Sequence, residues 1–168
     1  MLEKITKILN KAEDIITRIT AIMIILLTIF VSWQAFARYV LNTGQFWAEE
    51  VSIVTMMWIG FLGASGGVWT DSHIGLKFFI GKLPYTLHKL SNIVNNLIIA
   101  IFSSLLFYYG IVLVKKTMSG TLSATKIPIG YSYLIIPIST AFMTIFSLYK
   151  IIRNIIEIYQ NKKVNPRG

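Results

Sequence analysis

Side chains that could do chemistry are few in this sequence, and none forms a known reactive pattern. The chain has no cysteine, which excludes disulfides, thiolate metal sites and a cysteine nucleophile. Its two histidines, His73 and His88, fall in one segment between apolar stretches, so they cannot hold a haem between membrane helices. No phosphate-binding loop, nucleophile elbow or H-E-x-x-H metal motif occurs. The sequence therefore predicts no enzyme activity, no cofactor and no metal.

The composition is that of a membrane protein. Of the 168 residues, 55% are apolar and only 14% are charged, whereas a soluble domain carries about 25% charged residues. Four stretches are uncharged and near the length of about 20 residues that spans a bilayer: residues 19–37, 51–70, 93–114 and 127–149. Each must be helical, because lipid cannot satisfy open backbone groups. The predicted fold is an all-α integral membrane protein with one domain of four transmembrane helices over residues 1–168.

Two segments outside these spans have an amphipathic character. Apolar residues recur at helical spacing in the N-terminal tail, which predicts an interfacial helix over residues 1–18 lying on membrane lipid. A helix docked on a partner protein needs the same stripe, so it stays an alternative. Residues 71–92 are also half apolar and are expected to form a short amphipathic segment at the membrane surface. The stripe in the tail consists of Leu2, Ile5, Leu9, Ala12, Ile16 and Ile19.

The net charge of +9 is best explained by topology rather than by a nucleic-acid partner. With four spans, the two tails and the middle segment lie on one side of the membrane. That side holds 12 of the 16 Lys and Arg residues, including Lys150 just after the fourth span. The positive-inside rule therefore predicts that both termini are cytoplasmic.

The middle of each span lacks an ionisable side chain. A solute that crosses a membrane must be met near the midplane by charged groups or by freed backbone groups of a broken helix. Only Pro137, which is expected to kink the fourth span, hints at an interruption. The chain is therefore predicted not to transport a solute by itself.

The second span carries small residues on one side, at offsets 0, 3, 4 and 7. Small residues let membrane helices approach closely, either within the bundle or against another subunit, and the sequence leaves both possibilities open. The third and fourth spans carry uncharged polar stripes, for which interhelical hydrogen bonds are the better explanation. The small residues are Gly60, Gly63, Ala64 and Gly67; the stripes are Asn92, Asn96, Ser103 and Gly110, and Ser132, Ser139, Thr140, Thr144 and Ser147.

Charged residues gather where the first two spans are connected. Arg38 closes the first span, Trp47 marks a membrane interface, and Glu49 and Glu50 open the second span, where the helix dipole favours acidic groups. Arg38 is expected to pair with one of the two glutamates. Such a pair would order the turn, and it would also shape a docking surface if a partner covers it.

Several runs in the first half of the chain resemble one family of membrane proteins. Residues 36–42 read FARYVLN, residues 47–50 read WAEE, and residues 58–64 read WIGFLGA; His73-Ile74 and Leu83-Pro84 follow. In this order and spacing they resemble the small membrane subunit, called the Q or DctQ-type subunit, of tripartite ATP-independent periplasmic (TRAP) transporters. Lys77 departs from the pattern, since an acidic residue often follows the histidine in that family.

The resemblance implies a function that the residues alone do not supply. In TRAP systems a periplasmic binding protein delivers an organic acid, such as sialic acid or a four-carbon dicarboxylate, and a large membrane subunit imports it with a sodium gradient. The small subunit, in the bacterial inner membrane, braces the large one. The resemblance makes Arg38, Trp47, Glu49, Glu50, Trp58, Gly60, Gly63, Ala64, Gly67 and His73 candidates for subunit contact.

Two other functions remain possible on the sequence alone. One is a self-contained small transporter or channel, which the uncharged spans disfavour. The other is a generic four-helix assembly factor of the membrane, which nothing outside the resemblance distinguishes. The transported substrate is not encoded here, because its site is expected on other chains.

Overall fold

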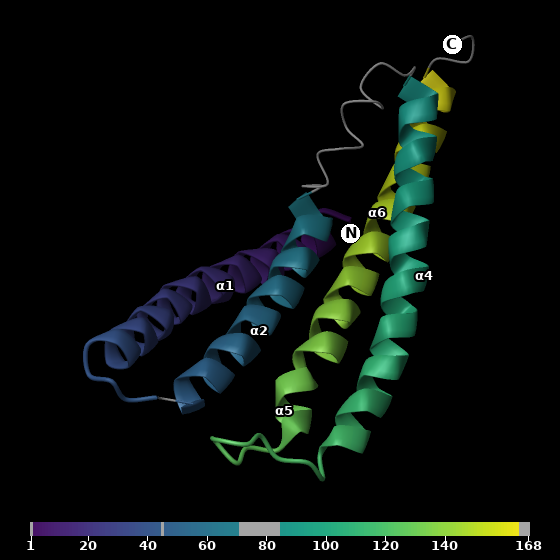
Figure 1. The fold of residues 1–168 in the computed structure, drawn as a ribbon. Coiled ribbons are helices and arrows are strands. Elements are labelled where there is room, and N and C mark those ends of the chain that lie inside the picture. Colours follow the sequence, from purple (N-terminus) through teal and green to yellow (C-terminus); the bar gives the residue numbers. More distant parts are fainter. Residues whose placement is uncertain (1, 45, 71–84, 165–168) are drawn as a thin grey trace.

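The computed structural model describes residues 2–44, 46–70 and 85–164, and most of them are helical (Figure 1). Four of the helices are long and apolar enough to cross a membrane, which confirms the predicted all-α fold with four spans. A short helix precedes the last of these four in the described part of the chain. The helices are α1 (Leu2–Tyr39), α2 (Phe46–Thr70), α4 (Tyr85–Thr117), α5 (Ile129–Tyr133) and α6 (Ile135–Val164).

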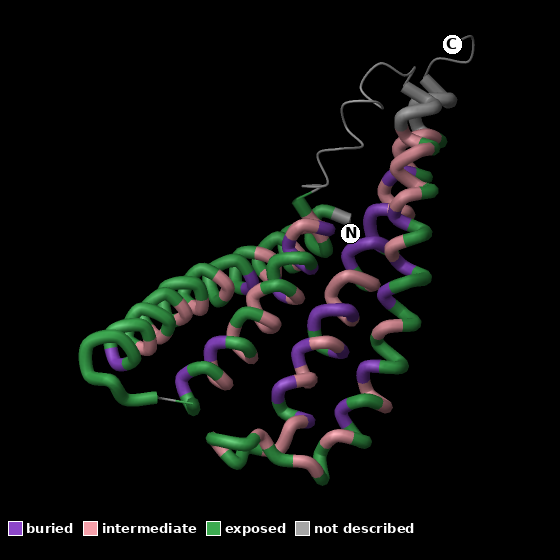
Figure 2. Tube along the Cα trace, in the orientation of Figure 1, coloured by how far each residue is buried: buried purple, intermediate pink, exposed green. Residues whose placement is uncertain are grey.

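The long helices pack side by side in the order α4, α6, α2, α1. Helix α4 lies along α6, α2 packs on α6, and α1 packs on α2 (Figure 1). Helix α1 begins and helix α6 ends at one end of the bundle, here called the terminal end, where α2 also stops. Residues 40–44 and 118–128, which follow α1 and α4, lie at the opposite end, here called the loop end. Burial is greatest on α6, whereas α1 is exposed along most of its length (Figure 2).

The polar stripes predicted on the third and fourth spans are largely buried, although the hydroxyls of Ser139 and Ser147 have no hydrogen-bond partner among the described residues. Asn96, Ser103, Ser139, Thr140 and Ser147 are all buried. The predicted interhelical hydrogen bond is confirmed for one pair, because the hydroxyls of Ser103 and Thr144 lie 2.8 Å apart. Asn96 and Thr140 instead donate to backbone carbonyls of their own helices, which satisfies them equally well in an apolar layer.

The predicted kink at Pro137 appears as a break between α5 and α6. Proline has no N–H, so the carbonyl of Tyr133, four residues earlier, has no helical donor. Helix α5 ends at Tyr133, and α6 begins at Ile135. Helix α4 comes very close here, because a Cβ on Gly110 would lie only 3.2 Å from Cδ of Pro137.

The N-terminal tail differs from the prediction. It is helical, but it continues without a break into the first span as the 38-residue helix α1. At 1.5 Å per residue α1 is about 57 Å long, well beyond the roughly 30 Å of hydrocarbon in a bilayer. No Gly or Pro occurs between Leu2 and Tyr39, so nothing in the sequence ends the helix near residue 18.

The apolar stripe of the tail packs inside this chain, which was not one of the two predicted alternatives. Ile16 belongs to the buried core with Leu62 and Phe146, and Leu9 packs against that core. Ile5 and Ile19, at the two ends of the stripe, remain exposed. The stripe is therefore packed within the chain at Leu9 and Ile16 and is exposed at its two ends.

The predicted amphipathic segment over residues 71–92 is only partly described. Residues 71–84, with His73 and Lys77, lie outside the described residues. Residues 85–92 are not a separate surface segment but the first turns of α4. The sequence contains no helix-breaking residue between Tyr85 and Asn92, so the helix of the third span extends back through them.

Gly130 provides a test of how tightly α5 packs on α4. A Cβ on this residue would lie 2.7 Å from Sδ of Met118 and 2.9 Å from the carbonyl oxygen of Val114. Gly130→Ala should therefore overpack the contact and destabilise the protein by about 1–3 kcal/mol. A Cβ on Gly60 would meet nothing within 4 Å, so Gly60→Ala is the matched control. Thermal unfolding in detergent measures both, and equal midpoints for the two variants would contradict this packing.

Candidate subunit interface

Arg38 does not form the predicted ion pair. Its side chain lies exposed in the last turn of α1, and none of the ion pairs between described residues includes it. Glu49 is likewise exposed in the first turn of α2. The prediction failed because it assumed that the nearest opposite charges in sequence would meet, whereas Glu50 is used by a different part of the chain.

Glu50 fixes the connection between α4 and α5. Its carboxylate accepts hydrogen bonds from the backbone N–H of Ala124 at 2.7 Å and of Thr125 at 2.9 Å, and from the Thr125 hydroxyl at 3.0 Å. This connection is a tight hairpin, in which Leu122 N–H donates to the carbonyl of Ile127. Glu50 thus joins the start of α2 to residues 118–128 at the loop end.

The two tryptophan candidates have different surroundings. The indole N–H of Trp58 donates to the carbonyl of Ser132 in α5 at 3.0 Å, so this residue holds α2 to α5 within the chain. Trp47, in contrast, is 43% exposed at the beginning of α2. Only Trp47 of the two therefore offers a large uncovered surface to another molecule.

The small residues of α2 are not packed within the chain. A Cβ built on Gly60, Gly63 or Gly67 would find no atom within 4 Å, and Ala64 is exposed. The buried side of α2 is instead formed by Leu62, Ser65, Gly66 and Val68. Of the two alternatives that the sequence left open, packing of these glycines inside the bundle is not observed among the described residues.

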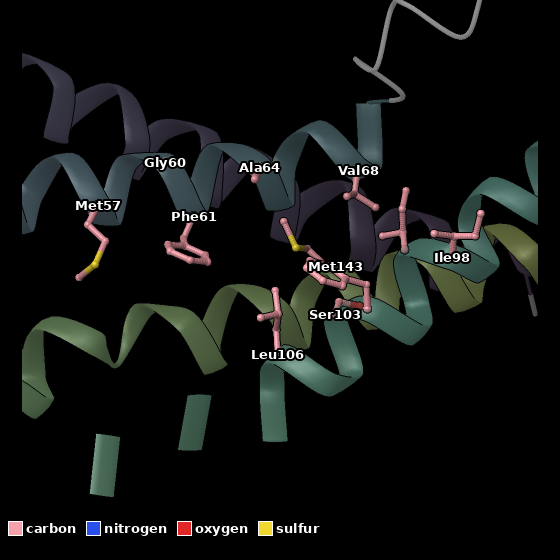
Figure 3. Close-up of a pocket in the computed structure, with 11 residues that line it drawn as sticks. Met57, Gly60, Phe61, Ala64, Val68, Ile98, Ser103, Leu106 and Met143 are labelled. Atoms are coloured by element: carbon pink, nitrogen blue, oxygen red, sulfur yellow. The ribbon is translucent and has the colours of Figure 1, made fainter. Parts of the chain in front are cut away.

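Two grooves flank α2. The α2–α4 groove has a volume of about 520 Å³, and its walls are almost wholly apolar, with Gly60 and Ala64 on α2 facing α4 and with Met143 of α6 between them (Figure 3). The α1–α2 groove has a volume of about 460 Å³. Its α2 wall contains Gly63, Gly66 and Gly67, and its α1 wall contains polar side chains, including that of Glu13.

Lys150 has a role that the sequence reading missed. In the sequence analysis Lys150 served only to mark the end of the fourth span. In the structure α6 continues past Lys150, and the Lys150 side chain is just 3% exposed. Its ammonium group donates to the carbonyl of Val68 at 2.7 Å and lies 5.9 Å from the ring centroid of Trp69. Carbonyls in the last turn of a helix lack helical donors, and a cation there also matches the helix dipole. Lys150 therefore caps the end of α2.

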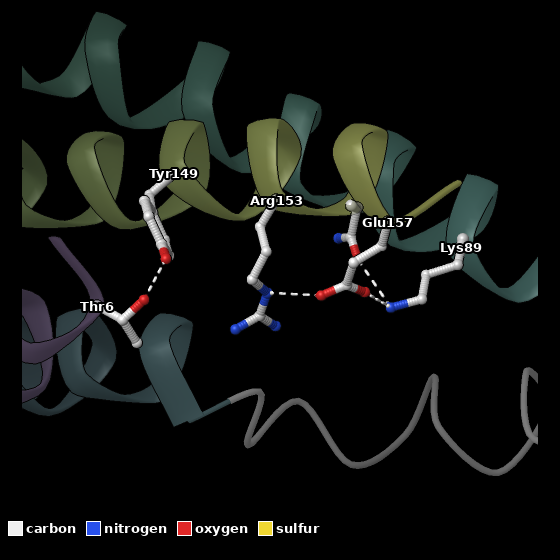
Figure 4. Close-up of polar contacts among 6 residues, drawn as sticks. Thr6, Lys89, Tyr149, Arg153 and Glu157 are labelled. Atoms are coloured by element: carbon white, nitrogen blue, oxygen red, sulfur yellow. Dashed lines mark hydrogen bonds and ion pairs between the residues drawn. The ribbon is translucent and has the colours of Figure 1, made fainter. Parts of the chain in front are cut away.

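Aromatic and polar contacts join three helices around this cap. The Trp69 ring packs on Phe146 and Tyr149, with centroids 5.1 Å and 5.7 Å away, and its N–H donates to the side-chain oxygen of Asn10 at 3.0 Å. The hydroxyls of Tyr149 and Thr6 are also hydrogen-bonded (Figure 4). These contacts fix the beginning of α1 and the end of α2 on α6.

Further along the terminal end, an ion-paired cluster joins α4 to α6. The ammonium group of Lys89 pairs with Glu157 and donates to Asn154 at 3.3 Å (Figure 4). Arg153 lies 3.5 Å from the same carboxylate, one helical turn away. Partly exposed pairs of this kind contribute little to stability, about 1 kcal/mol or less, but they keep the two helices in register.

The family is established by comparison with known proteins. Residues 11–157 match the model of the DctQ component of tripartite ATP-independent periplasmic transporters. The chain belongs to this family, the small membrane subunits of TRAP transporters, as the resemblance predicted. The family is one of transporter subunits, which is not an enzyme class.

Individual relatives agree with this assignment. The sialic acid TRAP transporter small permease protein SiaQ of Vibrio cholerae is 34% identical over 83 residues, which is 49% of this chain and 46% of SiaQ. The sialic acid TRAP transporter permease protein SiaT of Haemophilus influenzae is 27% identical over 62% of this chain, but only 17% of SiaT is covered. A protein of the same species, assigned as a TRAP transporter small permease protein, is 27% identical over 88% of this chain and 89% of its own length. The matches to SiaQ and SiaT thus span less than half of those proteins.

The cap on α2 can be tested by replacing Lys150. Lys150→Met keeps most of the side-chain volume but leaves the Val68 carbonyl without its donor, which should destabilise the protein by about 1–3 kcal/mol. Backbone amides of residues 66–70 should then exchange faster with deuterated solvent, because the last turn of α2 frays. Lys115→Met, at an exposed position, is the control and should change neither property. Unaltered exchange in Lys150→Met would show that this hydrogen bond does not hold the helix end.

Proposed function

We propose that this chain is a scaffold subunit, which braces the large membrane subunit of a TRAP transporter while that subunit moves the substrate. The observation that carries the proposal is the open small-residue surface of α2, around Gly60, Gly63 and Gly67, on a helix that is fixed at both ends. An uncovered surface of this kind suits close packing against a helix of another protein. The four uncharged stretches provide no midplane charge with which the chain could bind a solute itself.

The transport reaction proposed for the complete system is sodium-driven import of an organic acid delivered by a periplasmic binding protein. The names of SiaQ and SiaT support sialic acid as the transported class, with a dicarboxylate as the alternative. This part of the proposal rests on family membership, since the residues described here include no candidate substrate site.

The surface proposed for contact with the large subunit has two parts. The first is the side of α2 that carries Gly60, Gly63, Ala64 and Gly67, which remains open in the isolated chain. The second is the loop end, where Arg38, Trp47 and Glu49 are exposed and lie within reach of either the large subunit or the binding protein. Glu50 and Trp58 would act indirectly there, since both hold the loop end in shape within the chain.

A self-contained transporter is the competing function, and reconstitution distinguishes the two. The purified chain in proteoliposomes, with a sodium gradient and a binding protein loaded with sialic acid, should give no uptake above empty vesicles. Adding the large subunit should restore uptake, and the two chains should co-purify at equal stoichiometry. Uptake by the small chain alone would overturn the scaffold function.

The proposed orientation places the terminal end in the cytoplasm and the loop end in the periplasm. The distribution of Lys and Arg supports it, with 12 of 16 on the terminal side. Because the chain has no cysteine, single cysteines can report the topology directly. A membrane-impermeant thiol reagent added to intact cells should label Thr43→Cys and Ser119→Cys but not Glu3→Cys. Labelling of Glu3→Cys alone would reverse the orientation.

A further inference from the structure

The α1–α2 groove has features that indicate a particular kind of occupant. It is lined on one side by glycines of α2 and on the other by Glu13, Thr17 and Thr20 of α1. A Cβ on Gly63 or Gly67 would meet nothing, so the α2 backbone itself is open to close approach. In a bilayer such close approach is the usual means by which one helix packs on another.

The carboxylate of Glu13 accepts few hydrogen bonds from the described residues of the chain. It accepts one hydrogen bond, from the Thr17 hydroxyl at 2.8 Å, and makes no other bond or ion pair with a described residue. An ionised carboxylate offers about four acceptor sites, so most of its capacity is free. No other residue of the α1–α2 groove is charged, and the α2–α4 groove has no ionisable residue in its walls.

The depth of Glu13 makes a cationic partner favourable. Asn10, one turn before Glu13, is bonded to Trp69 near the end of α2, so Glu13 lies level with the last turns of α2. The uncharged stretch of residues 51–70 ends there, so the sequence puts Glu13 near the edge of the expected apolar layer, where an opposite charge would stabilise an ionised group. Helices of a membrane protein that follows the positive-inside rule carry Lys or Arg at this depth on the cytoplasmic side.

The α1–α2 groove is complementary in charge and shape to one kind of occupant. We propose that the α1–α2 groove receives a transmembrane helix of the large subunit, and that Glu13 pairs with a Lys or Arg at the cytoplasmic end of that helix. The inference rests on the scaffold function proposed above and adds the site and the chemistry of the contact.

Photo-crosslinking in cells that also make the large subunit tests the groove. With p-benzoylphenylalanine at Thr20, inside the groove, irradiation should give an adduct with the large subunit. The same group at Ile22, which is exposed and about 180° from the groove on α1, is the control and should give at least tenfold less adduct. An adduct with lipid only at Thr20, from a complex that still co-purifies, would overturn the groove assignment and leave the scaffold function standing. Failure of the wild-type chain to co-purify with the large subunit would overturn both.

The charge of Glu13 is tested in the same assay. Glu13→Lys should lower the Thr20 adduct at least tenfold, whereas Glu13→Asp should retain most of it. Glu13→Gln keeps the shape of the side chain and its bond from Thr17, so it separates the charge from folding; it should lower the adduct severalfold. An undiminished adduct in Glu13→Gln would show that no cationic group is bound there.

Discussion

Helix α2 is fixed at each of its ends by one charged side chain, and the position of α1, which packs on α2, depends on these two attachments. At the loop end, Glu50 accepts backbone hydrogen bonds from Ala124 and Thr125. At the terminal end, Lys150 donates to the carbonyl of Val68. Both bonds are charge-assisted, and such bonds are roughly twice as strong as neutral ones. Between these attachments α2 packs on both α6 and α1, yet a Cβ on Gly60, Gly63 or Gly67 would meet no described atom within 4 Å.

The position of α1 follows from that of α2. Helix α1 packs mainly on α2, and only its first turns reach α6, through the hydroxyls of Thr6 and Tyr149. The α4–α6 pair is built differently, with buried polar stripes and close approaches at Gly110 and Gly130. Helix α2 thus packs on the α4–α6 pair, and α1 packs on α2 with most of its surface exposed.

The sequence was sufficient to predict the spans, because a bilayer admits only long apolar helices, and Pro137 correctly marked the interruption of the fourth. It also predicted that Ser103 and Thr144 lie in a polar helix interface. It was not sufficient for Lys150, whose function depends on where the end of α2 meets α6, and no local pattern encodes that distance. The expected pair of Arg38 with a glutamate was wrong for a related reason, since the backbone of residues 124 and 125 competes for Glu50. The stripe that includes Ile16 gave the correct helix but not its partner, because an amphipathic face fits lipid and protein alike.

The central claim is that the open face of α2 becomes covered when the large subunit binds, and oxygen accessibility measures this most directly. A nitroxide spin label on Gly63→Cys should collide freely with molecular oxygen when the chain is alone in lipid bilayers. On addition of the large subunit the collision rate should fall severalfold, while a label on Ile22→Cys, on the far side of α1, should keep its rate. An unchanged rate at Gly63 in the assembled complex would contradict the account.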